Sequence, residues 1–392
     1  MNGFWESLIR TKYRRIILHV ARDAQSGVWA LMRNLAAEQA KKQDTFVALG
    51  LMCSRNWPQS YREQLQSATF PVPFLSTFAP FHSYSVAFLM LILHNPLRGW
   101  LRKIRHLQPE AEIIVHFHNA WLAGGFFPLL RDSRIYYVST IHGVADDHRL
   151  RTVWWLRCIH RFLAGRLCRY NVQVTSVSRE GVKRIDEILG IPAAKIKVIA
   201  NGMPDHGIMH VHSADSPFTV GHVGQLHPGK GWQFLLEAVD ILYAEGRTVN
   251  CVLAGRGPDE EKVKEAAATR PYVHYLGLVP DAGETVIPNL SALVLATWSE
   301  GMPMAVIEAF CAGVPVLATA VGGLPEMIEA GKNGDFIERD ARSIADKIRI
   351  WLDSPERYRQ ARRQARETFC NEYNIEQIGA RYEQLYNQLV FK

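Results

Sequence analysis

Short apolar segments alternate with longer segments in which apolar residues recur at helical spacing, through both halves of the chain. This alternation is typical of parallel β-sheets whose faces are covered by helices. The apolar segments expected as strands are 16–21, 46–49, 113–116, 135–140, 172–177 and 196–199 in the first half, and 218–223, 250–254, 273–276, 293–296 and 314–318 in the second. The pattern therefore predicts an α/β protein with two doubly wound domains.

A polar stretch at 202–217 separates the two sets of strands. It is rich in Pro, Gly and His, a composition that favours a linker over a regular element. We therefore expect one domain over 1–205 and a second over 206–371, with a hinge between them.

Residues that could bind a metal are scattered along the chain. His206, His210 and His212 lie in or near the linker without a set of Cys, Glu or Asp at ligand spacing, and the chain has no Asp-x-Asp motif. The six cysteines show no Cys-x-x-Cys spacing, which indicates buried thiols in a reducing compartment. We therefore expect neither a metal nor a cofactor.

The chain of 392 residues has a formal charge of +7 that is unevenly distributed. Residues 1–205 contain 27 Lys and Arg against 14 Asp and Glu, a net +13, and the remaining residues contain 18 against 24, a net −6. A strongly positive surface attracts nucleic acid or anionic lipid. Basic and aromatic residues mix at helical spacing in 98–105 and 149–170, which suits a membrane surface, and no nucleic-acid-binding module is recognisable. Anionic lipid is therefore the favoured partner of the basic half.

The sequence predicts no membrane-spanning segment. The longest uncharged apolar run, 86–93, would as a helix cover only about 12 Å of a bilayer core about 30 Å thick. The apolar run 16–21 is followed at once by Arg22 and Asp23, too soon for the core of a signal peptide. We expect a cytoplasmic protein that lies peripherally on the inner face of the cell membrane.

The segment 300–311 places two carboxylates around a glycine, a proline and the start of a helix. Pro303 suits the first turn of a helix, where its missing N–H is not needed, so Glu300 should lie in the preceding loop and Glu308 in the second turn. The free N–H groups at such a helix start favour a diphosphate, and a carboxylate nearby can accept hydrogen bonds from sugar or ribose hydroxyl groups. The segment therefore predicts a nucleotide-sugar site.

A glycine stop and an apolar strand follow at 312–318, and a glycine turn opens another helix at 321–328. This succession of elements resembles the donor-binding signature of retaining glycosyltransferases of family four. The resemblance implies the GT-B architecture, in which two Rossmann-like domains face one another across a cleft. It is nearly continuous over 220–334 and implies that a final helix at 372–392 returns to the first domain.

A glycine-rich loop follows the first predicted strand of the second half. Gly224, Gly229 and Lys230 have the spacing of a P-loop, but Gly231 stands where a P-loop has the Ser or Thr that holds magnesium, so a kinase or NTPase is disfavoured. The resemblance implies that Lys230 binds the donor diphosphate. It also implies an arginine where this chain has Gln225, and a neutral amide cannot neutralise phosphate charge as a guanidinium does.

The resemblance implies a donor site that extends over several loops. Its residues would be Gly27, Gly224, Gln225, Lys230, Arg256, Leu278, Val279, Glu300, Gly301, Met302, Pro303 and Glu308. Glu300 would bond the transferred sugar and Glu308 the ribose, with the base near Leu278 and Val279. Arg256, in a glycine turn, either supplies the charge of the missing arginine or is an exposed turn residue.

Polar residues also end two strands of the first half, where open parallel sheets bind ligands. His142 follows the strand 135–140, and the resemblance implies that it bonds a hydroxyl group of the donor sugar. His116, His118 and Asn119 end the preceding strand and are candidates for the acceptor side. The turn after the first strand keeps a single glycine, Gly27, where the family usually has two.

These features predict a retaining, metal-independent hexosyltransferase with His142, Lys230 and Glu300 as catalytic residues. It would move a hexosyl group from a UDP- or GDP-sugar to a saccharide acceptor, lipid-linked, in cell-surface polysaccharide or lipopolysaccharide biosynthesis. Two alternatives stay open: a non-hydrolysing sugar-nucleotide epimerase with the same architecture, and a non-catalytic nucleotide-sugar-binding protein. Dinucleotide oxidoreductases are disfavoured because the full glycine fingerprint is missing.

Overall fold

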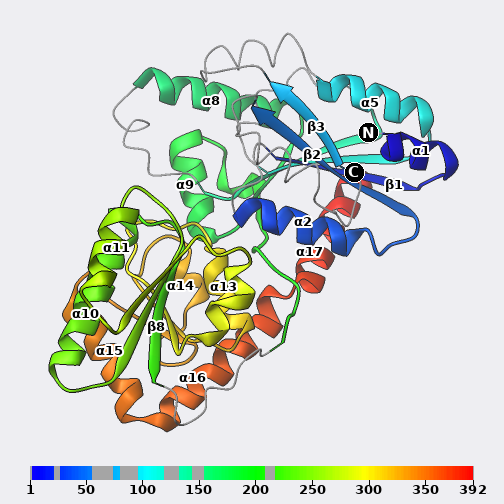
Figure 1. Ribbon diagram of the computed structural model, residues 1–392. Coiled ribbons are helices and arrows are strands. Elements are labelled where there is room, and N and C mark those ends of the chain that lie inside the picture. Colours follow the sequence, from blue (N-terminus) through cyan, green and yellow to red (C-terminus); the bar gives the residue numbers. More distant parts are fainter. Residues whose placement is uncertain are drawn as a thin grey trace. The chain divides into compact units, whose positions relative to one another are not determined.

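The computed structural model describes residues 2–21, 27–54, 74–79, 96–118, 132–143, 154–207 and 217–391. The chain forms two compact units, each with its own sheet (Figure 1). Unit 1 contains Met1–Ala200 together with Ile375–Lys392, and unit 2 contains Asn201–Asn374. The units divide at 200/201 and 374/375, whereas the sequence was expected to divide at 205/206 and 371/372.

Unit 1 is built around a parallel sheet whose seven described strands have the order β3-β2-β1-β4-β5-β6-β7. The strands are β1 (Arg15–Ala21), β2 (Thr45–Ser54), β3 (Phe74–Ala79), β4 (Glu112–Phe117), β5 (Ile135–Ile141), β6 (Gln173–Ser176) and β7 (Ile196–Val198). β1 is buried on both faces, as a central strand of a helix-covered parallel sheet must be. The apolar segments predict six of these strands but not β3, in which Ser76 and Thr77 interrupt the apolar run.

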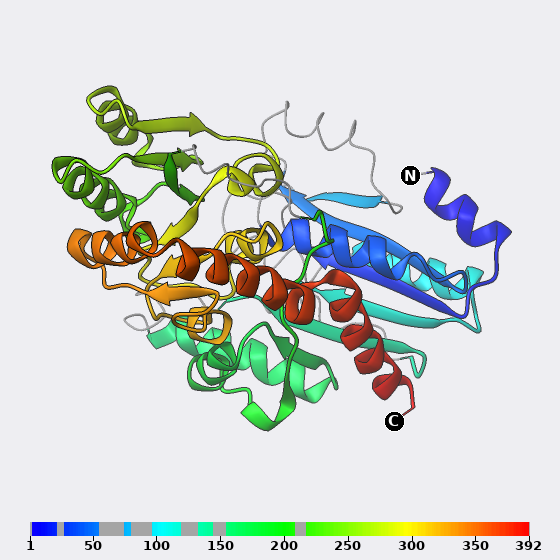
Figure 2. The same cartoon turned by 90° about the horizontal axis from the view of Figure 1, so that it is seen from below.

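Helices cover this sheet and include the last helix of the chain. They are α1 (Asn2–Arg10), α2 (Gly27–Gln39), α5 (Pro96–Leu107), α8 (Trp154–Arg169), α9 (Arg179–Leu189) and α17 (Ile375–Val390). α17 packs against α2 (Figures 1 and 2), and the core beneath them contains Ile17, Met32, Leu35, Ile378 and Tyr382. The C-terminal segment therefore belongs to unit 1.

Unit 2 is a parallel sheet whose described strands have the order β10-β9-β8-β11-β12-β13. The strands are β8 (Phe218–Val223), β9 (Val249–Ala254), β10 (Val273–Gly277), β11 (Ala292–Leu295), β12 (Val316–Ala318) and β13 (Gly334–Phe336). The helices are α10 (Trp232–Ala244), α11 (Glu260–Ala268), α12 (Ala282–Thr285), α13 (Met304–Cys311), α14 (Leu324–Met327), α15 (Ala341–Asp353) and α16 (Pro355–Thr368). α10 packs against α15, as Figure 1 shows. The apolar pattern misses only β13, whose three residues carry a single apolar side chain.

A fully buried arginine fastens α17 to the sheet of unit 1. Arg15, on β1, donates from Nε and Nη2 to Oε2 of Glu112 at 2.9 and 2.7 Å. Its guanidinium also donates to Oδ1 of Asn387 at 2.8 Å and pairs with Glu383, both on α17. A buried guanidinium needs this many acceptors because its desolvation is otherwise uncompensated.

We predict that Arg15→Ala lowers the free energy of unfolding of unit 1 by roughly 3–5 kcal/mol, because it removes the cation that pairs with Glu112 and one of the two cations that pair with Glu383, the other being Lys42. Arg14→Ala is the matched control: Arg14 makes an ion pair with Asp44 at 2.8 Å, with both side chains 52% exposed. Its removal should change stability by less than about 1 kcal/mol. Urea unfolding of both variants measures the difference, and equal losses would contradict a structural role for Arg15.

Candidate functional site

The carboxyl ends of β8 and β11 mark the point in unit 2 where the strand order reverses. The chain proceeds from β8 outward through β9 and β10, and from β11 in the opposite direction through β12 and β13. Open parallel sheets bind their ligands at such a point, outside the carboxyl ends of the strands. The loops after β8, β9, β11 and β12 meet here, and they carry most of the residues predicted for the donor site.

Glycines allow these loops to touch through their backbones. A Cβ atom on Gly255, after β9, would lie 1.8 Å from the carbonyl oxygen of Gly224, after β8. A Cβ atom on Gly322, after β12, would lie 1.7 Å from the carbonyl oxygen of Glu300. Both glycines also have positive φ angles, so no other residue fits these positions without strain. The glycine turns of the sequence therefore fix how closely the loops approach.

Lys230 and Glu300 form an ion pair across the junction of two of these loops. Lys230 ends the 3-10 turn Pro228–Lys230, which follows β8, and Glu300 follows β11. The Nζ atom of Lys230 donates to Oε1 of Glu300 at 2.5 Å, and the side chains are 21% and 12% exposed. The backbone N–H of Trp298 donates to the carbonyl oxygen of Gly229 at 2.9 Å and holds the loops at this distance. Two residues predicted as catalytic are thus in direct contact.

Glu308 lies in the second turn of α13, as its spacing from Pro303 predicts; Pro303 itself is the residue that caps the helix. The Glu308 carboxyl group packs against Gly283. A Cβ atom added to Gly283 would lie only 2.6 Å from Cδ of Glu308. Burial, and secondarily the charge of Glu284, raise the pKa of Glu308 to about 7. This carboxyl group is therefore only partly ionised at neutral pH.

Four of the remaining predicted donor residues, Gln225, Arg256, Leu278 and Val279, are exposed or half-buried. Gln225 is exposed, and the Arg256 side chain is 65% exposed and 3.9 Å from Glu260 on α11, so Arg256 is an exposed turn residue in this structure. Leu278, after β10, is 61% exposed and Val279 is half-buried.

Met302 fixes the loop before α13. The amide Nδ2 of Asn201 donates to its carbonyl oxygen at 2.9 Å, and the side chain of Met302 is buried. Asn201 thereby ties the start of unit 2 to the segment that carries Glu300, Gly301 and Pro303.

An arginine and a tryptophan that the sequence did not single out brace the turn that carries Lys230. The Cζ atom of Arg339 lies 4.2 Å from the centre of the Trp298 ring, and its Nη2 donates to the carbonyl oxygen of Pro228 at 3.0 Å. Trp298 is 68% exposed. A cation stacked on an aromatic ring is stabilised by the charge distribution of the ring. The only feature of the sequence that could have indicated this contact was the position of Trp298, two residues before Glu300.

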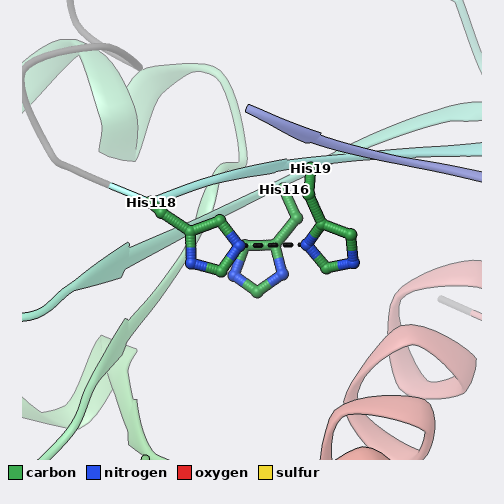
Figure 3. Close-up of side chains that lie close together, drawn as sticks. All are labelled: His19, His116 and His118. Carbon is green, nitrogen blue, oxygen red and sulfur yellow. Dashed lines mark hydrogen bonds between the residues drawn. The ribbon is translucent and has the colours of Figure 1, made fainter. Parts of the chain in front are cut away.

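Four histidines meet at the carboxyl ends of three central strands of unit 1. His19 on β1 lies opposite His116 on β4, and His118 and His142 follow β4 and β5. In Figure 3 the rings of His19 and His118 point toward one another, with the ring of His116 beside them. The sequence prediction included His116, His118 and His142 but missed His19. A polar residue within the apolar strand 16–21 could have pointed to His19.

Hydrogen bonds occupy both ring nitrogens of His19, His116 and His118. The bonded pairs are His19 Nδ1 and His118 Nε2 (3.0 Å), His19 Nε2 and Gln39 Oε1 (2.7 Å), His118 Nδ1 and His142 Nε2 (3.2 Å), His116 Nδ1 and the Tyr386 hydroxyl (2.8 Å), and His116 Nε2 and Thr140 Oγ1 (2.6 Å). Burial lowers the pKa of His19 to about 4 and places the pKa values of His116 and His118 well below their usual range. All three imidazoles are therefore neutral at pH 7.

The spacing of these three histidines could also admit a metal ion, because one nitrogen from each lies within 4.8 Å of the others. A metal would have to replace hydrogen bonds that already use all the ring nitrogens of the three residues. The donor set therefore fits a hydrogen-bonded network better than a metal centre. His116 and His118, predicted for the acceptor side, are both buried in this structure.

Several predicted residues lie outside or at the edge of the described ranges. Asn119, His210 and His212 are outside them, and Gly27 is described only as the first residue of α2. His206 lies 3.4 Å from Glu284, within unit 2.

Basic helices line the surface of unit 1. On α5, Arg98, Arg102 and Lys103 are exposed while Leu97, Leu101 and Ile104 are buried. On α8, Phe162 is 64% exposed between the exposed Arg161 and Arg169. Among the helices in the described ranges, none has the length and apolar character that crossing a bilayer requires.

Comparison with known protein families identifies both halves of the chain. Residues 217–354 match the model of the glycosyl transferases group 1, and residues 26–202 match that of the glycosyl transferase 4-like domain. The chain is 28% identical over 208 residues to WcaL of Escherichia coli strain K12, named for colanic acid biosynthesis, a match that covers 49% of this chain and 50% of WcaL. It is 26% identical over 263 residues to the O-antigen biosynthesis glycosyltransferase WbnH of Escherichia coli, covering 66% of this chain and 72% of WbnH. The chain thus spans about half the length of the first of these relatives.

Solved structures share the fold at low sequence identity. HepE of Anabaena in complex with UDP-glucose has a TM-score of 0.72 and 17% identity, over 95% of this chain and 99% of HepE. TarM of S. aureus, in a mutant form complexed with UDP, fondaparinux and alpha-GlcNAc-glycerol, has a TM-score of 0.73 and 13% identity, over 95% of this chain and 100% of TarM. With two doubly wound units, matching family models over both of them and these structural neighbours, the chain belongs to the group 1 glycosyltransferases and has the GT-B fold.

Proposed function

We propose that this protein is a retaining glycosyltransferase that moves a hexosyl group from a UDP- or GDP-sugar to a lipid-linked saccharide during the synthesis of a cell-surface polysaccharide. The observation that carries the proposal is the ion pair between Lys230 and Glu300 at the carboxyl ends of β8 and β11. A cation and a carboxylate in contact at this point of the fold match the two chemically different parts of a nucleotide sugar. Relatives named for O-antigen and capsular polysaccharide biosynthesis support the class of product.

In this proposal Lys230 binds the diphosphate of the donor. A phosphate oxygen competes with Glu300 for the ammonium group, and charge-assisted hydrogen bonds to phosphate are among the strong ones. Glu300 is then free to accept hydrogen bonds from hydroxyl groups of the sugar. The resting ion pair therefore keeps both groups desolvated and aligned before the donor arrives.

The chemical step needs stabilisation of the leaving diphosphate more than a nucleophile from the protein. The bond from the anomeric carbon to the phosphate oxygen breaks, and the acceptor oxygen forms its bond on the same face of the sugar. The acceptor proton passes to the departing phosphate, so the charge that develops there is the charge that Lys230 stabilises. Preorganised cations of this kind supply a large part of enzymatic rate enhancement.

In this proposal Glu308 binds the ribose of the donor. The basic face of unit 1 binds the membrane that holds the lipid-linked acceptor. Arg98, Arg102 and Lys103 project from α5 while its apolar residues are buried in the unit. Each basic residue near an anionic membrane surface contributes about 1 kcal/mol of attraction. HepE was solved in complex with UDP-glucose and TarM in complex with UDP, which favours uridine as the base.

We predict that Lys230→Ala weakens binding of the nucleotide sugar by about tenfold or more, because a charge-assisted hydrogen bond to the diphosphate is removed. Lys262→Ala is the matched control, since Lys262 is an exposed lysine of the same unit that pairs with Asp259 at 3.0 Å. Calorimetric titration with UDP-glucose and a panel of other UDP- and GDP-sugars gives both dissociation constants. Equal affinities of the two variants would remove Lys230 from the donor site.

We predict that affinity for a nucleotide sugar rises with pH between 6 and 8. The ionised form of Glu308 accepts the hydrogen bonds of the ribose, and its pKa of about 7 means that the ionised fraction grows through this range. If only the ionised form binds, the dissociation constant falls by up to about tenfold. Glu308→Gln should bind more weakly and show no such dependence, and a pH profile identical to that of the unaltered protein would contradict the assignment.

We predict that replacing Arg98, Arg102 and Lys103 together by Gln lowers binding to vesicles containing anionic lipid by at least about tenfold at low salt. Replacing Arg357, Arg359 and Arg363, which are exposed on α16 of unit 2, removes the same charge and serves as the control. Vesicle co-sedimentation distinguishes the two variants. A similar loss in both would show that net charge, and not the α5 face, drives the association.

A further inference from the structure

A chain of hydrogen bonds runs from a buried amide to the histidine assigned to the donor sugar. Oε1 of Gln39, the last residue of α2, is 2.7 Å from Nε2 of His19, and Nδ1 of His19 is 3.0 Å from Nε2 of His118. Nδ1 of His118 is 3.2 Å from Nε2 of His142. Gln39, His19 and His118 are buried. Three imidazoles are thus linked head to tail inside unit 1.

The direction of these hydrogen bonds follows from the group at the buried end. The Gln39 amide is oriented with its oxygen toward His19, and an amide oxygen only accepts, so in this orientation Nε2 of His19 donates to Gln39 and carries the proton. A neutral imidazole has one N–H, which leaves Nδ1 of His19 as an acceptor for Nε2–H of His118. Nδ1 of His118 then accepts in turn from Nε2–H of His142. One amide therefore sets the proton positions of all three rings.

The surroundings keep this chain neutral and rigid. Desolvation holds the pKa of His19 near 4 and that of His118 well below its usual value, so neither ring takes up a second proton at pH 7. The ring of His116 stacks on that of His118 with centroids 4.2 Å apart, and His116 is held by Tyr386 and Thr140. This second branch fixes the orientation of the His118 ring.

We propose that Gln39, His19 and His118 are positioning residues that hold His142 in the Nε2–H tautomer, so that its Nδ1 acts as a hydrogen-bond acceptor. The proposal rests on the proposed function together with the expectation, drawn from the family resemblance, that His142 bonds a hydroxyl group of the donor sugar. Nδ1 of His142 then accepts a hydrogen bond from a hydroxyl group of the sugar. An O-methyl or deoxy sugar lacks this donor. Such a site discriminates against analogues because a buried acceptor left unpaired is unfavourable.

The test begins with the tautomer of His142 in the full chain without ligand. Two-bond ¹H–¹⁵N correlation spectra of protein labelled at histidine distinguish Nε2–H, Nδ1–H and doubly protonated rings, and a His142→Gln sample assigns the signal. The expected result at pH 7.5 is a single Nε2–H tautomer for His142. An Nδ1–H tautomer or an imidazolium would overturn the proposal. Because no nucleotide sugar is present, this result is independent of the proposed function.

The second arm compares the same substitution at two buried glutamines of unit 1. Gln39→Met takes away the terminal acceptor, while Gln108→Met removes an amide that donates to the carbonyl oxygens of Leu8 and Thr11, away from the histidines. Both should lose similar thermal stability. Only Gln39→Met should mix the His142 tautomers and lower kcat/KM for the donor, by about five- to tenfold. Identical spectra and rates for the two variants would overturn the proposal.

Discussion

The ion pair between Lys230 and Glu300 depends on a close approach of backbone loops that are 70 residues apart in the chain. Parallel strands place the carboxyl ends of β8 and β11 side by side, and the glycines after β9 and β12 let neighbouring loops touch main chain to main chain. Arg339 and Trp298 then brace the turn that carries the lysine. The chemistry proposed for unit 2 uses only what this arrangement brings together: a cation for phosphate, and a carboxylate beside it for sugar hydroxyls.

Unit 1 uses buried polar groups in a comparable way. Arg15 holds α17 to the sheet, and α17 supplies Tyr386, which bonds His116. Buried polar groups are unfavourable unless they are fully bonded, so each of these networks is compatible with few other packings of the chain. The last helix of the sequence thereby helps to define the histidine network at the ends of β1, β4 and β5.

The sequence was sufficient for features that depend on local patterns. Apolar segments predicted eleven of the described strands, and the placement of Glu300, Pro303 and Glu308 around a helix start follows from proline and helix chemistry. It was insufficient where partners are distant: nothing near Arg339 indicates Pro228, and nothing near Gln39 indicates His19. β13 was missed for a different reason, because three residues with one apolar side chain carry no periodicity.

The most direct test of the central claim is a crystal structure of the full chain with an intact nucleotide sugar. We expect the diphosphate to lie within hydrogen-bonding distance of Lys230 Nζ, Glu300 to be released from the lysine and turned to the sugar, and the ribose to contact Glu308. A nucleotide sugar bound elsewhere, with the Lys230–Glu300 pair still closed, would contradict it.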